Sequence, residues 1–273
     1  MELATCLNCG VSLRPNQRFC YNCGQRTNTS RVTFRHLFHD FLQTFAHADR
    51  GLLNLIKGLA INPGRTAVEY IEGKRKKYFN PFAFLGLCIA FMVFMNNWIK
   101  PYNDLPSPDP AVLARIPDEN LRQLYLVSIE RNVRVQKFVN KNLNIASVLV
   151  APYFAFMLWL FFKRRKRNIA ELTITYILFT GFANVLSTIL VSPWMSYYRN
   201  SFTNDVLIYC NIFLQTLYFS WGIKTLLGYN TASGYFKVFG ALFLIGLIGF
   251  IILLIGFFFY IYRGESFQVL KYL

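Results

Sequence analysis

Five long apolar runs follow one another from Asn80 to the end of the chain, and polar or basic stretches separate them. A helix rises about 1.5 Å per residue, so about 20 apolar residues cross the hydrocarbon core of a bilayer. Each run approaches that length, although the first and the fourth are short. Residues 80–273 are therefore predicted to form an all-α, polytopic membrane domain with five transmembrane helices. The predicted spans are residues 82–99, 143–162, 172–192, 206–222 and 238–261.

Residues 100–142 lie between the first two spans and divide into two parts. Residues 100–117 contain five of the ten prolines and no periodicity, so we expect an irregular loop there. From Asp118 onward apolar residues recur at helical spacing, and the early negative charge of Asp118 and Glu119 is typical of a helix start. We expect this outer helix to run into the second span, either as an amphipathic extension or as a substrate-gating element.

The composition supports the membrane class. Hydrophobic residues make up 54% of the 273-residue chain and charged residues only 15%, against roughly 25% in soluble domains. This profile argues against an ordinary soluble domain and against a disordered chain. The formal net charge is +16, which in a soluble protein would indicate nucleic-acid binding. In a membrane protein the positive-inside rule accounts for it, so we do not expect a nucleic-acid partner.

The basic residues gather on one side of the predicted spans. Near the membrane, 11 cations fall on the side of the N-terminus and 3 on the opposite side, with residues 100–142 left aside. Because cations concentrate in cytoplasmic loops, we predict a cytoplasmic N-terminus and a C-terminus outside. The 11 cations are Lys74, Arg75, Lys76, Lys77, Lys163, Arg164, Arg165, Lys166, Arg167, Lys224 and Lys237, and the 3 are Arg199, Arg263 and Lys271.

Residues 1–28 contain four cysteines in the pattern C-x2-C-x10-C-x2-C, and a glycine follows each pair. Each pair can place two thiolates on one ion, so the spacing predicts a zinc ribbon with one structural zinc ion. Disulfides are the weaker alternative because the cytosol is reducing. A four-thiolate site leaves no open position for catalysis, so we expect a docking or structural role. The predicted metal ligands are Cys6, Cys9, Cys20 and Cys23.

Residues 29–79 are predicted to form a cytoplasmic arm of amphipathic helices. All three histidines lie between residues 36 and 47, on one stripe of a helix whose opposite face is apolar. One interpretation is an interfacial helix that lies on the inner leaflet. The other is a functional site, because His36 and Asp40 lie one turn apart and could bind a metal together with His39. The catalytic candidates on this stripe are His36, His39, Asp40, His47 and Arg50.

The second half of the arm carries turn and cap signals. Residues 62–64 (Asn-Pro-Gly) break the first helix, a short helix follows over 65–72, and Gly73 ends it. The basic run that comes next is expected to set the topology and to contact anionic lipid. The alternative is a phosphate clamp formed with the N-terminus of the following helix. The candidate headgroup residues are Lys74, Arg75, Lys76, Lys77 and Tyr78.

The spans themselves carry little chemistry. Gly246, Gly249 and Gly256 share one side of the last span, which predicts a packing face within the subunit or between two subunits. No Asp, Glu, Lys, Arg or His lies in the core of any predicted span. This argues against a proton-coupled transporter.

Three motifs occur in order along the first third of the chain: CxxCG…FCxxCGQ, TFRHLFHDFLQTFAHADRG and NPG…EYIEGKRKKYFNPF. Over roughly residues 1–95 this combination, followed by several spans, resembles a bacterial inner-membrane family, the domain of unknown function 3667. The resemblance implies a location and a layout but no particular reaction. Besides the four cysteines, the matching positions are His36, His39, Asp40, His47, Asp49, Arg50, Gly51, Pro63, Gly64, Tyr70, Gly73, Lys74, Arg75, Tyr78, Asn80 and Pro81.

From these features we expect an inner-membrane adaptor or scaffold subunit whose ribbon and arm dock a partner. The alternative is a membrane enzyme or lipid-handling protein, in which the histidine stripe acts with Lys74–Lys77 at an anionic headgroup. A transporter is the least favoured function. The expected partners are membrane lipids and either another protein or a second copy of the chain, bound through the transmembrane helices.

Overall fold

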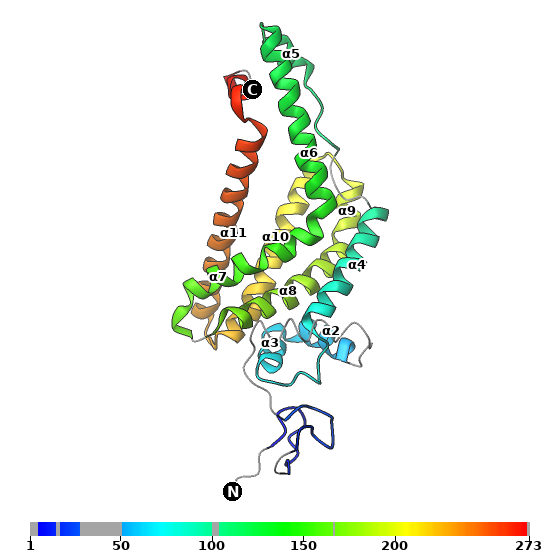
Figure 1. Ribbon diagram of the computed structural model, residues 1–273, viewed down its shortest axis with the longest axis vertical. Coiled ribbons are helices and arrows are strands. Elements are labelled where there is room, and N and C mark those ends of the chain that lie inside the picture. The colour runs from blue at the N-terminus through cyan, green and yellow to red at the C-terminus, as the bar shows by residue number, and fades with distance from the viewer. Residues whose placement is uncertain (1–4, 15–16, 28–50, 100–103, 166, 272–273) are drawn as a thin grey trace.

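The computed structural model describes residues 5–14, 17–27, 51–99, 104–165 and 167–271. Within these ranges the fold is helical apart from two isolated β-bridges near the N-terminus, which confirms the predicted all-α class. Figure 1 shows the N-terminal ribbon at one end of the helical bundle and the C-terminus at the other. The elements are α2 (Gly51–Ile61), α3 (Pro63–Ile71), α4 (Pro81–Ile99), α5 (Pro110–Arg115), α6 (Glu119–Leu149), α7 (Ala151–Phe161), η1 (Lys163–Arg165), α8 (Ile169–Leu190), α9 (Ser192–Tyr197), α10 (Phe202–Leu226), α11 (Ala232–Ile261) and η2 (Gly264–Lys271).

Four of the described helices, α4, α8, α10 and α11, are long and apolar enough to cross a membrane. They coincide with the first, third, fourth and fifth predicted runs. In α8, 72% of the most apolar segment is buried inside the protein, against 22% in each of the other three. α8 is therefore the central helix, and the others turn most of their apolar surface outward, where a bilayer would cover it.

The second predicted run, residues 143–162, is divided between two helices. α6 ends at Leu149, and α7 begins after Val150 with Pro152 in its first turn. Proline has no backbone N–H and its ring crowds the carbonyl of the preceding turn, so a straight helix does not continue through it. Figure 1 shows the chain changing direction between α6 and α7. The hydrophobic run alone did not reveal this break.

The chain nevertheless has to return across the bundle between α4 and α8. The hydroxyl of Ser196 in α9 donates a hydrogen bond of 2.6 Å to the carbonyl oxygen of Ile99, the last residue of α4. Because α9 directly follows α8, α4 and α8 end on the same side and run parallel. The return path consists of α5, α6 and α7, and a fifth membrane crossing built from α6 and α7 stays a prediction.

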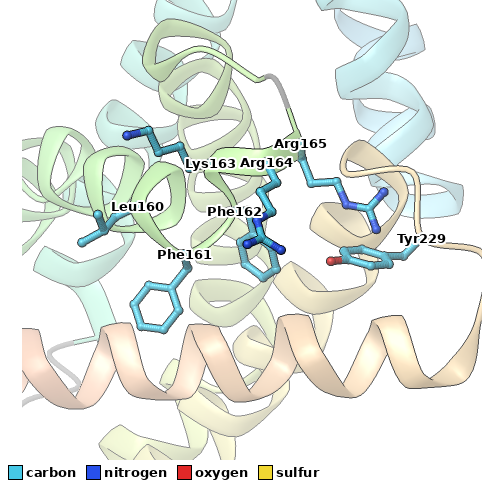
Figure 2. Close-up of a pocket in the computed structure, with 7 residues that line it drawn as sticks. All are labelled: Leu160, Phe161, Phe162, Lys163, Arg164, Arg165 and Tyr229. Atoms are coloured by element: carbon cyan, nitrogen blue, oxygen red, sulfur yellow. The ribbon is translucent and has the colours of Figure 1, made fainter.

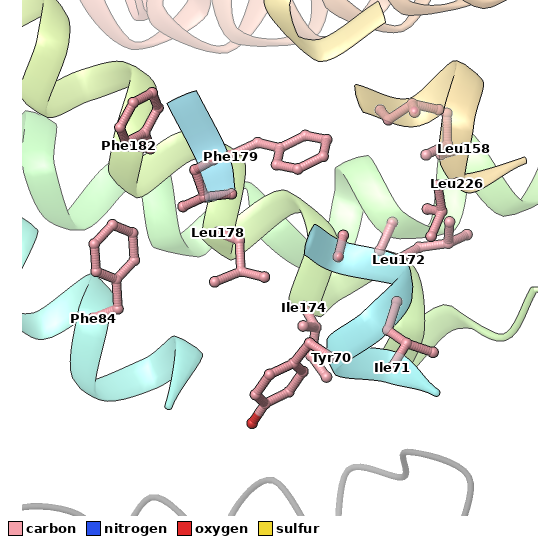
Figure 3. Close-up of a cluster of buried hydrophobic side chains, with 14 of the residues drawn as sticks. Tyr70, Ile71, Phe84, Leu158, Leu172, Ile174, Leu178, Phe179, Phe182 and Leu226 are labelled. Atoms are coloured by element: carbon pink, nitrogen blue, oxygen red, sulfur yellow. The ribbon is translucent and has the colours of Figure 1, made fainter. Parts of the chain in front are cut away.

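The main hydrophobic core surrounds α8 (Figure 3). Leu172, Ile174, Leu178 and Phe179 of α8 are almost wholly buried. Figure 3 shows that α3, α4, α7 and α10 each contribute side chains to the same cluster. These are Tyr70 and Ile71 of α3, Phe84 of α4, Leu158 of α7 and Leu226 of α10. α3 is therefore part of the core and not a separate surface helix.

α2, the first described helix of the arm, also packs against protein. Leu55 and Leu59 have no exposed surface, and the Tyr218 hydroxyl of α10 donates a 3.1 Å hydrogen bond to the Leu59 carbonyl. On the other side of the helix Leu53 and Ile61 are exposed. The interfacial interpretation of the arm therefore fits only one side of α2, because its other side belongs to the helical bundle.

The opposite end of the bundle is held by a second, smaller cluster. Ile116, Tyr125 and Val269 are buried together where α6 meets η2. The guanidinium of Arg131 donates to the carbonyls of Ile261 and Arg263, both at 3.1 Å. These contacts tie the outer part of α6 to the C-terminal end of α11.

The glycines of the last span lie in different surroundings. A Cβ at Gly249 would stand 3.1 Å from the ring of Tyr153 in α7, so this glycine lets α7 approach within the subunit. No described atom lies within 4 Å of the Cβ positions of Gly246 and Gly256. The predicted packing face is thus used at one glycine, and an interface with a second copy stays a prediction.

The closest approach between α3 and α10 depends on two glycines. A Cβ at Gly64 would overlap the carbonyl oxygen of Gly222 and the side chain of Thr225. Gly222 in turn leaves no room for a side chain because the ring of Phe179 lies against it. Gly64 is therefore needed for the close contact between α3 and α10, in addition to its place in the helix break.

We predict that Gly64→Ala destabilises the detergent-solubilised protein by about 2 kcal/mol, because a backbone carbonyl cannot move aside for the methyl group. Gly86→Ala in α4 is the matched control, since nothing lies within 4 Å of its Cβ position. Alanine is a better helix former than glycine, so the control should keep or slightly raise stability. Thermal unfolding in one detergent checks both, and equal midpoints for the two variants would contradict the packing argument.

Candidate functional site

The ribbon consists of two knuckles with the same backbone geometry. In the first, the N–H of Cys6 donates to the carbonyl of Val11 at 2.9 Å, and in the second the N–H of Cys20 donates to that of Gln25 at 2.7 Å. Antiparallel bridges join Thr5 to Ser12 and Phe19 to Arg26. The glycine after each pair has a positive φ, +74° at Gly10 and +69° at Gly24, a conformation that favours glycine.

The two knuckles bring the four predicted ligands together. The sulfur atoms of Cys6, Cys9, Cys20 and Cys23 all lie within 4.8 Å of one another. The Cys6 and Cys23 sulfurs are 3.6 Å apart, and so are those of Cys9 and Cys20. All four are free thiols, so no disulfide occupies the cluster. This arrangement is compatible with a single metal ion held by four cysteines.

The backbone prepares the thiols unequally for a metal. The N–H of Val11 faces the Cys9 sulfur and lowers the pKa of its thiol to about 6. Burial raises the pKa of the Cys6 thiol to about 11. Metal ligands bind as thiolates, so a cation in the cluster has to displace the Cys6 proton. Cys6, Cys20 and Leu13 form the small buried centre of the ribbon.

One residue of the second knuckle reaches out of the ribbon. Gln25 is polar, yet it is only 4% exposed. The residue at the same position of the first knuckle is the apolar Val11. The Gln25 amide nitrogen donates to the carbonyl of Gly73, and its amide oxygen accepts a 3.0 Å hydrogen bond from the N–H of Lys76. Both hydrogen-bonding ends of the amide are thereby used. The ribbon is joined by this clamp to residues 73–78, which we call the basic turn.

The basic turn is organised around a buried carboxylate. Glu69 in α3 accepts hydrogen bonds of 2.7 Å from the Lys77 ammonium and from the Tyr78 hydroxyl. Lys74 lies 3.2 Å and Arg65 3.3 Å from its other oxygen. Burial by itself would raise the pKa of Glu69, but the donors, led by Lys77, outweigh it and lower the pKa to about 2. The same contact raises the pKa of Lys77.

The predicted headgroup residues therefore have different roles in the structure. Lys74 and Lys77 are paired with Glu69, and Tyr78 is buried. The side chain of Lys76 is exposed. A cavity of about 260 Å³ beside Glu69 is bordered by Lys57, Arg65 and Lys77. These three cations therefore border a small hollow between α2 and α3.

The caps on either side of the basic turn follow the sequence prediction. The Asn62 side chain accepts the N–H of Arg65 at 3.2 Å, with Pro63 in the first turn of α3. The Asn80 side chain accepts the N–H of Phe82 at 2.9 Å at the start of α4. Gly73 has a φ of +115°, which explains why a glycine ends the short helix.

The histidine stripe cannot be placed in the same way. His36, His39, Asp40, His47 and Arg50 all lie outside the described residues. The interpretation of this stripe as a catalytic or metal-binding site stays a prediction.

Sequence reasoning missed Glu69 and Gln25 as functional residues. Both residues lie inside the quoted motifs, Gln25 at the end of FCxxCGQ and Glu69 at the start of EYIEGKRKKYFNPF, and the spacing assigned neither of them a role. An alignment of the two knuckles with each other would have singled out Gln25, because a polar amide replaces the apolar Val11.

Comparison with known proteins bears on the part of the chain that contains the basic turn. Residues 49–93 match the family described as Protein of unknown function (DUF3667). The match confirms the family resemblance for α2, α3 and most of α4, and it includes Glu69 and the basic turn. It begins after the ribbon and the three histidines, and of the histidine stripe it includes only Arg50. No curated protein and no solved structure matches the chain.

We predict that Glu69→Gln lowers stability at neutral pH by about 2 kcal/mol, because a neutral amide replaces a carboxylate that accepts charged hydrogen bonds. The folded-state pKa of about 2 lies below the ordinary value of 4.5, so the carboxylate stabilises the fold above pH 4.5. This contribution is lost as the pH falls toward 2. The difference in unfolding midpoint between the two proteins should thus be constant down to about pH 5 and then shrink.

The exposed neighbour Glu72 offers a control, because Glu72→Gln removes the same charge without touching the cluster. It should leave the midpoint nearly unchanged at every pH. A pH-independent difference for Glu69→Gln, or an equal loss in the control, would show that the buried pairing does not stabilise the turn.

Proposed function

We propose that this protein is a bacterial inner-membrane adaptor whose zinc ribbon, held against the membrane domain, docks a cytoplasmic protein partner. The observation that supports the proposal most directly is the Gln25 clamp on the basic turn. A ribbon on a free linker would present its surface in any orientation. The clamp instead gives it one orientation, and a preorganised surface binds a partner at a lower entropic cost.

The sulfur geometry supports zinc as the resident ion. Zinc bonds to thiolate sulfur at about 2.3 Å, so a tetrahedral site places its sulfurs about 3.8 Å apart. The two sulfur pairs at 3.6 Å, inside a cluster no wider than 4.8 Å, agree with this value. Four cysteines would complete the coordination of the ion. Its role would be to fold the ribbon, which has too small an apolar centre to fold alone.

The exposed surface of the ribbon supports a protein partner. Leu7 and Tyr21 occupy the same position in the two knuckles, and Phe19 lies one residue before the second knuckle. All three are at least half exposed. Aromatic side chains are enriched in protein interfaces, so Phe19 and Tyr21 are the proposed anchors. The Arg26 guanidinium lies 5.9 Å from the Phe19 ring centroid and adds a polar contact at its edge.

The proposed orientation follows from the charge distribution. The ribbon, the basic turn and η1 lie at one end of the bundle, and the C-terminus lies at the other (Figure 1). Placing the basic end in the cytoplasm satisfies the positive-inside rule and puts the C-terminus outside. The alternative function, a membrane enzyme or lipid-handling protein, depends on residues 36–50 and stays a prediction.

We predict that the purified chain contains one zinc ion, measured by elemental mass spectrometry against protein concentration. Cys20→Ser removes a ligand and should abolish stoichiometric zinc. Cys88→Ser is the control, since Cys88 lies in α4 and outside the cluster, and it should retain the ion. Zinc content that is absent from the unaltered chain, or unaffected by Cys20→Ser, would show that the ribbon does not hold zinc.

The adaptor role predicts a partner that touches the ribbon. A photoreactive phenylalanine at Tyr21 should give one discrete crosslinked protein in cells, whereas the same group at Arg115, at the other end of the bundle, should not give this adduct. The crosslinked protein, once purified, should bind the full chain in nanodiscs. Its affinity should fall at least tenfold with Phe19→Ser/Tyr21→Ser, because buried aromatic anchors dominate interfaces.

Gln25→Ala tests the clamp separately from the anchors. It should keep its zinc but bind the partner more weakly, while Gln17→Ala, whose described side-chain contact is with Arg14 inside the ribbon, should bind normally. The adaptor function is wrong if Tyr21 gives no discrete adduct, or if the purified partner binds the Phe19→Ser/Tyr21→Ser variant as tightly as the unaltered chain.

A further inference from the structure

A second basic feature, separate from the ribbon and the basic turn, lies where α7 ends. Residues 160–165 form the end of α7 and the short helix η1, and together with Tyr229 they line an open cavity of about 820 Å³ (Figure 2). Tyr229 belongs to the loop between α10 and α11. The sequence analysis used the cations here only as topology signals.

Three of the lining residues are exposed cations. Lys163, Arg164 and Arg165 form no ion pair with a carboxylate in the part of the chain that the structure describes. Three adjacent positive charges without a counter-charge attract an anion, and the attraction is strongest where an apolar wall excludes water. The positive charge at the cavity is therefore not neutralised by a carboxylate of the described residues.

The arginine beside Tyr229 is held in a defined position. The Arg165 guanidinium carbon lies 3.9 Å from the centroid of the Tyr229 ring, and Figure 2 shows this side chain extending from η1 to the ring. A guanidinium held over an aromatic ring by cation–π attraction still has N–H donors available for an anion. The Lys163 ammonium lies 5.2 Å from the Trp159 ring centroid. Donors oriented in this way match the oxygens of a phosphate group.

The next described cation of the same run serves a different purpose. Arg167 donates to the carbonyl of Leu226 at 3.3 Å and lies 3.7 Å from the Glu171 carboxylate. It thereby fixes the start of α8 to the end of α10. The basic run is thus divided between a residue that holds the fold together and residues that face the cavity.

The other wall of the cavity is apolar. Leu160 is 53% and Phe161 43% exposed, and Figure 2 shows Phe161 pointing from the end of α7 toward α11. A free phosphate ion gains nothing from such a surface. A phospholipid has an anionic phosphate for the cations and acyl chains for the apolar wall.

We propose that this cavity binds one anionic phospholipid, with Lys163, Arg164 and Arg165 at its phosphate and Leu160 and Phe161 against its acyl chains. The cavity volume lies in the range typical of sites for drug-sized ligands and exceeds what a free phosphate ion would fill. The site is independent of the adaptor function, because it shares no described residue with the ribbon, the clamp or the basic turn.

The test uses the full chain in detergent, titrated with phosphatidylglycerol and followed by native mass spectrometry. We expect one tightly bound lipid, and Arg164→Gln/Arg165→Gln should weaken its binding about tenfold or more, because each cation near a phosphate contributes separately. The control Lys137→Gln/Arg115→Gln removes the same charge from exposed positions elsewhere and should bind like the unaltered chain. Phosphatidylcholine should bind much more weakly.

Two further arms separate the headgroup from the acyl chains. Phe161→Ser should weaken the binding of phosphatidylglycerol and leave the weak binding of glycerol phosphate unchanged. If the double variant unfolds early, Arg164→Gln alone replaces it, since the contact between Arg165 and Tyr229 is then kept. Equal weakening in the control pair would show diffuse charge attraction only. Unchanged binding in the arginine variant, or displacement of the lipid by equimolar inorganic phosphate, would likewise overturn the proposal.

Discussion

The pairing of the buried Glu69 carboxylate with its neighbouring donors is the interaction on which the ribbon end of this structure depends. The carboxylate accepts hydrogen bonds from Lys77 and Tyr78 and pairs with Lys74, so the chain between α3 and α4 has to fold around it. The fold of this turn places the Gly73 carbonyl and the Lys76 N–H where one amide side chain reaches both. The position of the ribbon is therefore a consequence of a charge buried in α3.

The cations at this end of the bundle are used in three ways. Those around Glu69 neutralise a buried acid and shape the basic turn. Arg167 pairs with Glu171 and connects α8 to α10. Lys163, Arg164 and Arg165 face an open cavity without a carboxylate partner among the described residues. All of them lie at one end of the bundle, as the positive-inside rule would predict for a membrane protein, and the third group is the one for which we propose an anionic ligand.

The helical bundle supports these features through close packing at small residues. α8 is the buried axis, and Phe179 on it lies against Gly222 of α10, which in turn leaves room for Gly64 at the start of α3. This contact draws α3 into the core and presents Glu69 at the edge of the bundle. The family match over residues 49–93 covers α3 and the basic turn, so the matched region is also the region that joins the ribbon to the helical bundle.

The sequence by itself determined the features that depend on neighbours along the chain. Apolar runs predicted four helices long enough to cross a membrane, and Asn62 and Asn80 marked the starts of two helices. The spacing of the cysteines predicted that their four sulfurs lie close together. Only the tertiary structure decided which polar groups meet across long separations. Gln25 and Gly73 are 48 residues apart, and Arg165 lies in η1 whereas Tyr229 lies in the loop between α10 and α11. The break at Val150 is a local proline effect that a purely hydrophobic pattern conceals. Pairings of this kind depend on how helices pack, and hydropathy and spacing carry no information about which faces come into contact.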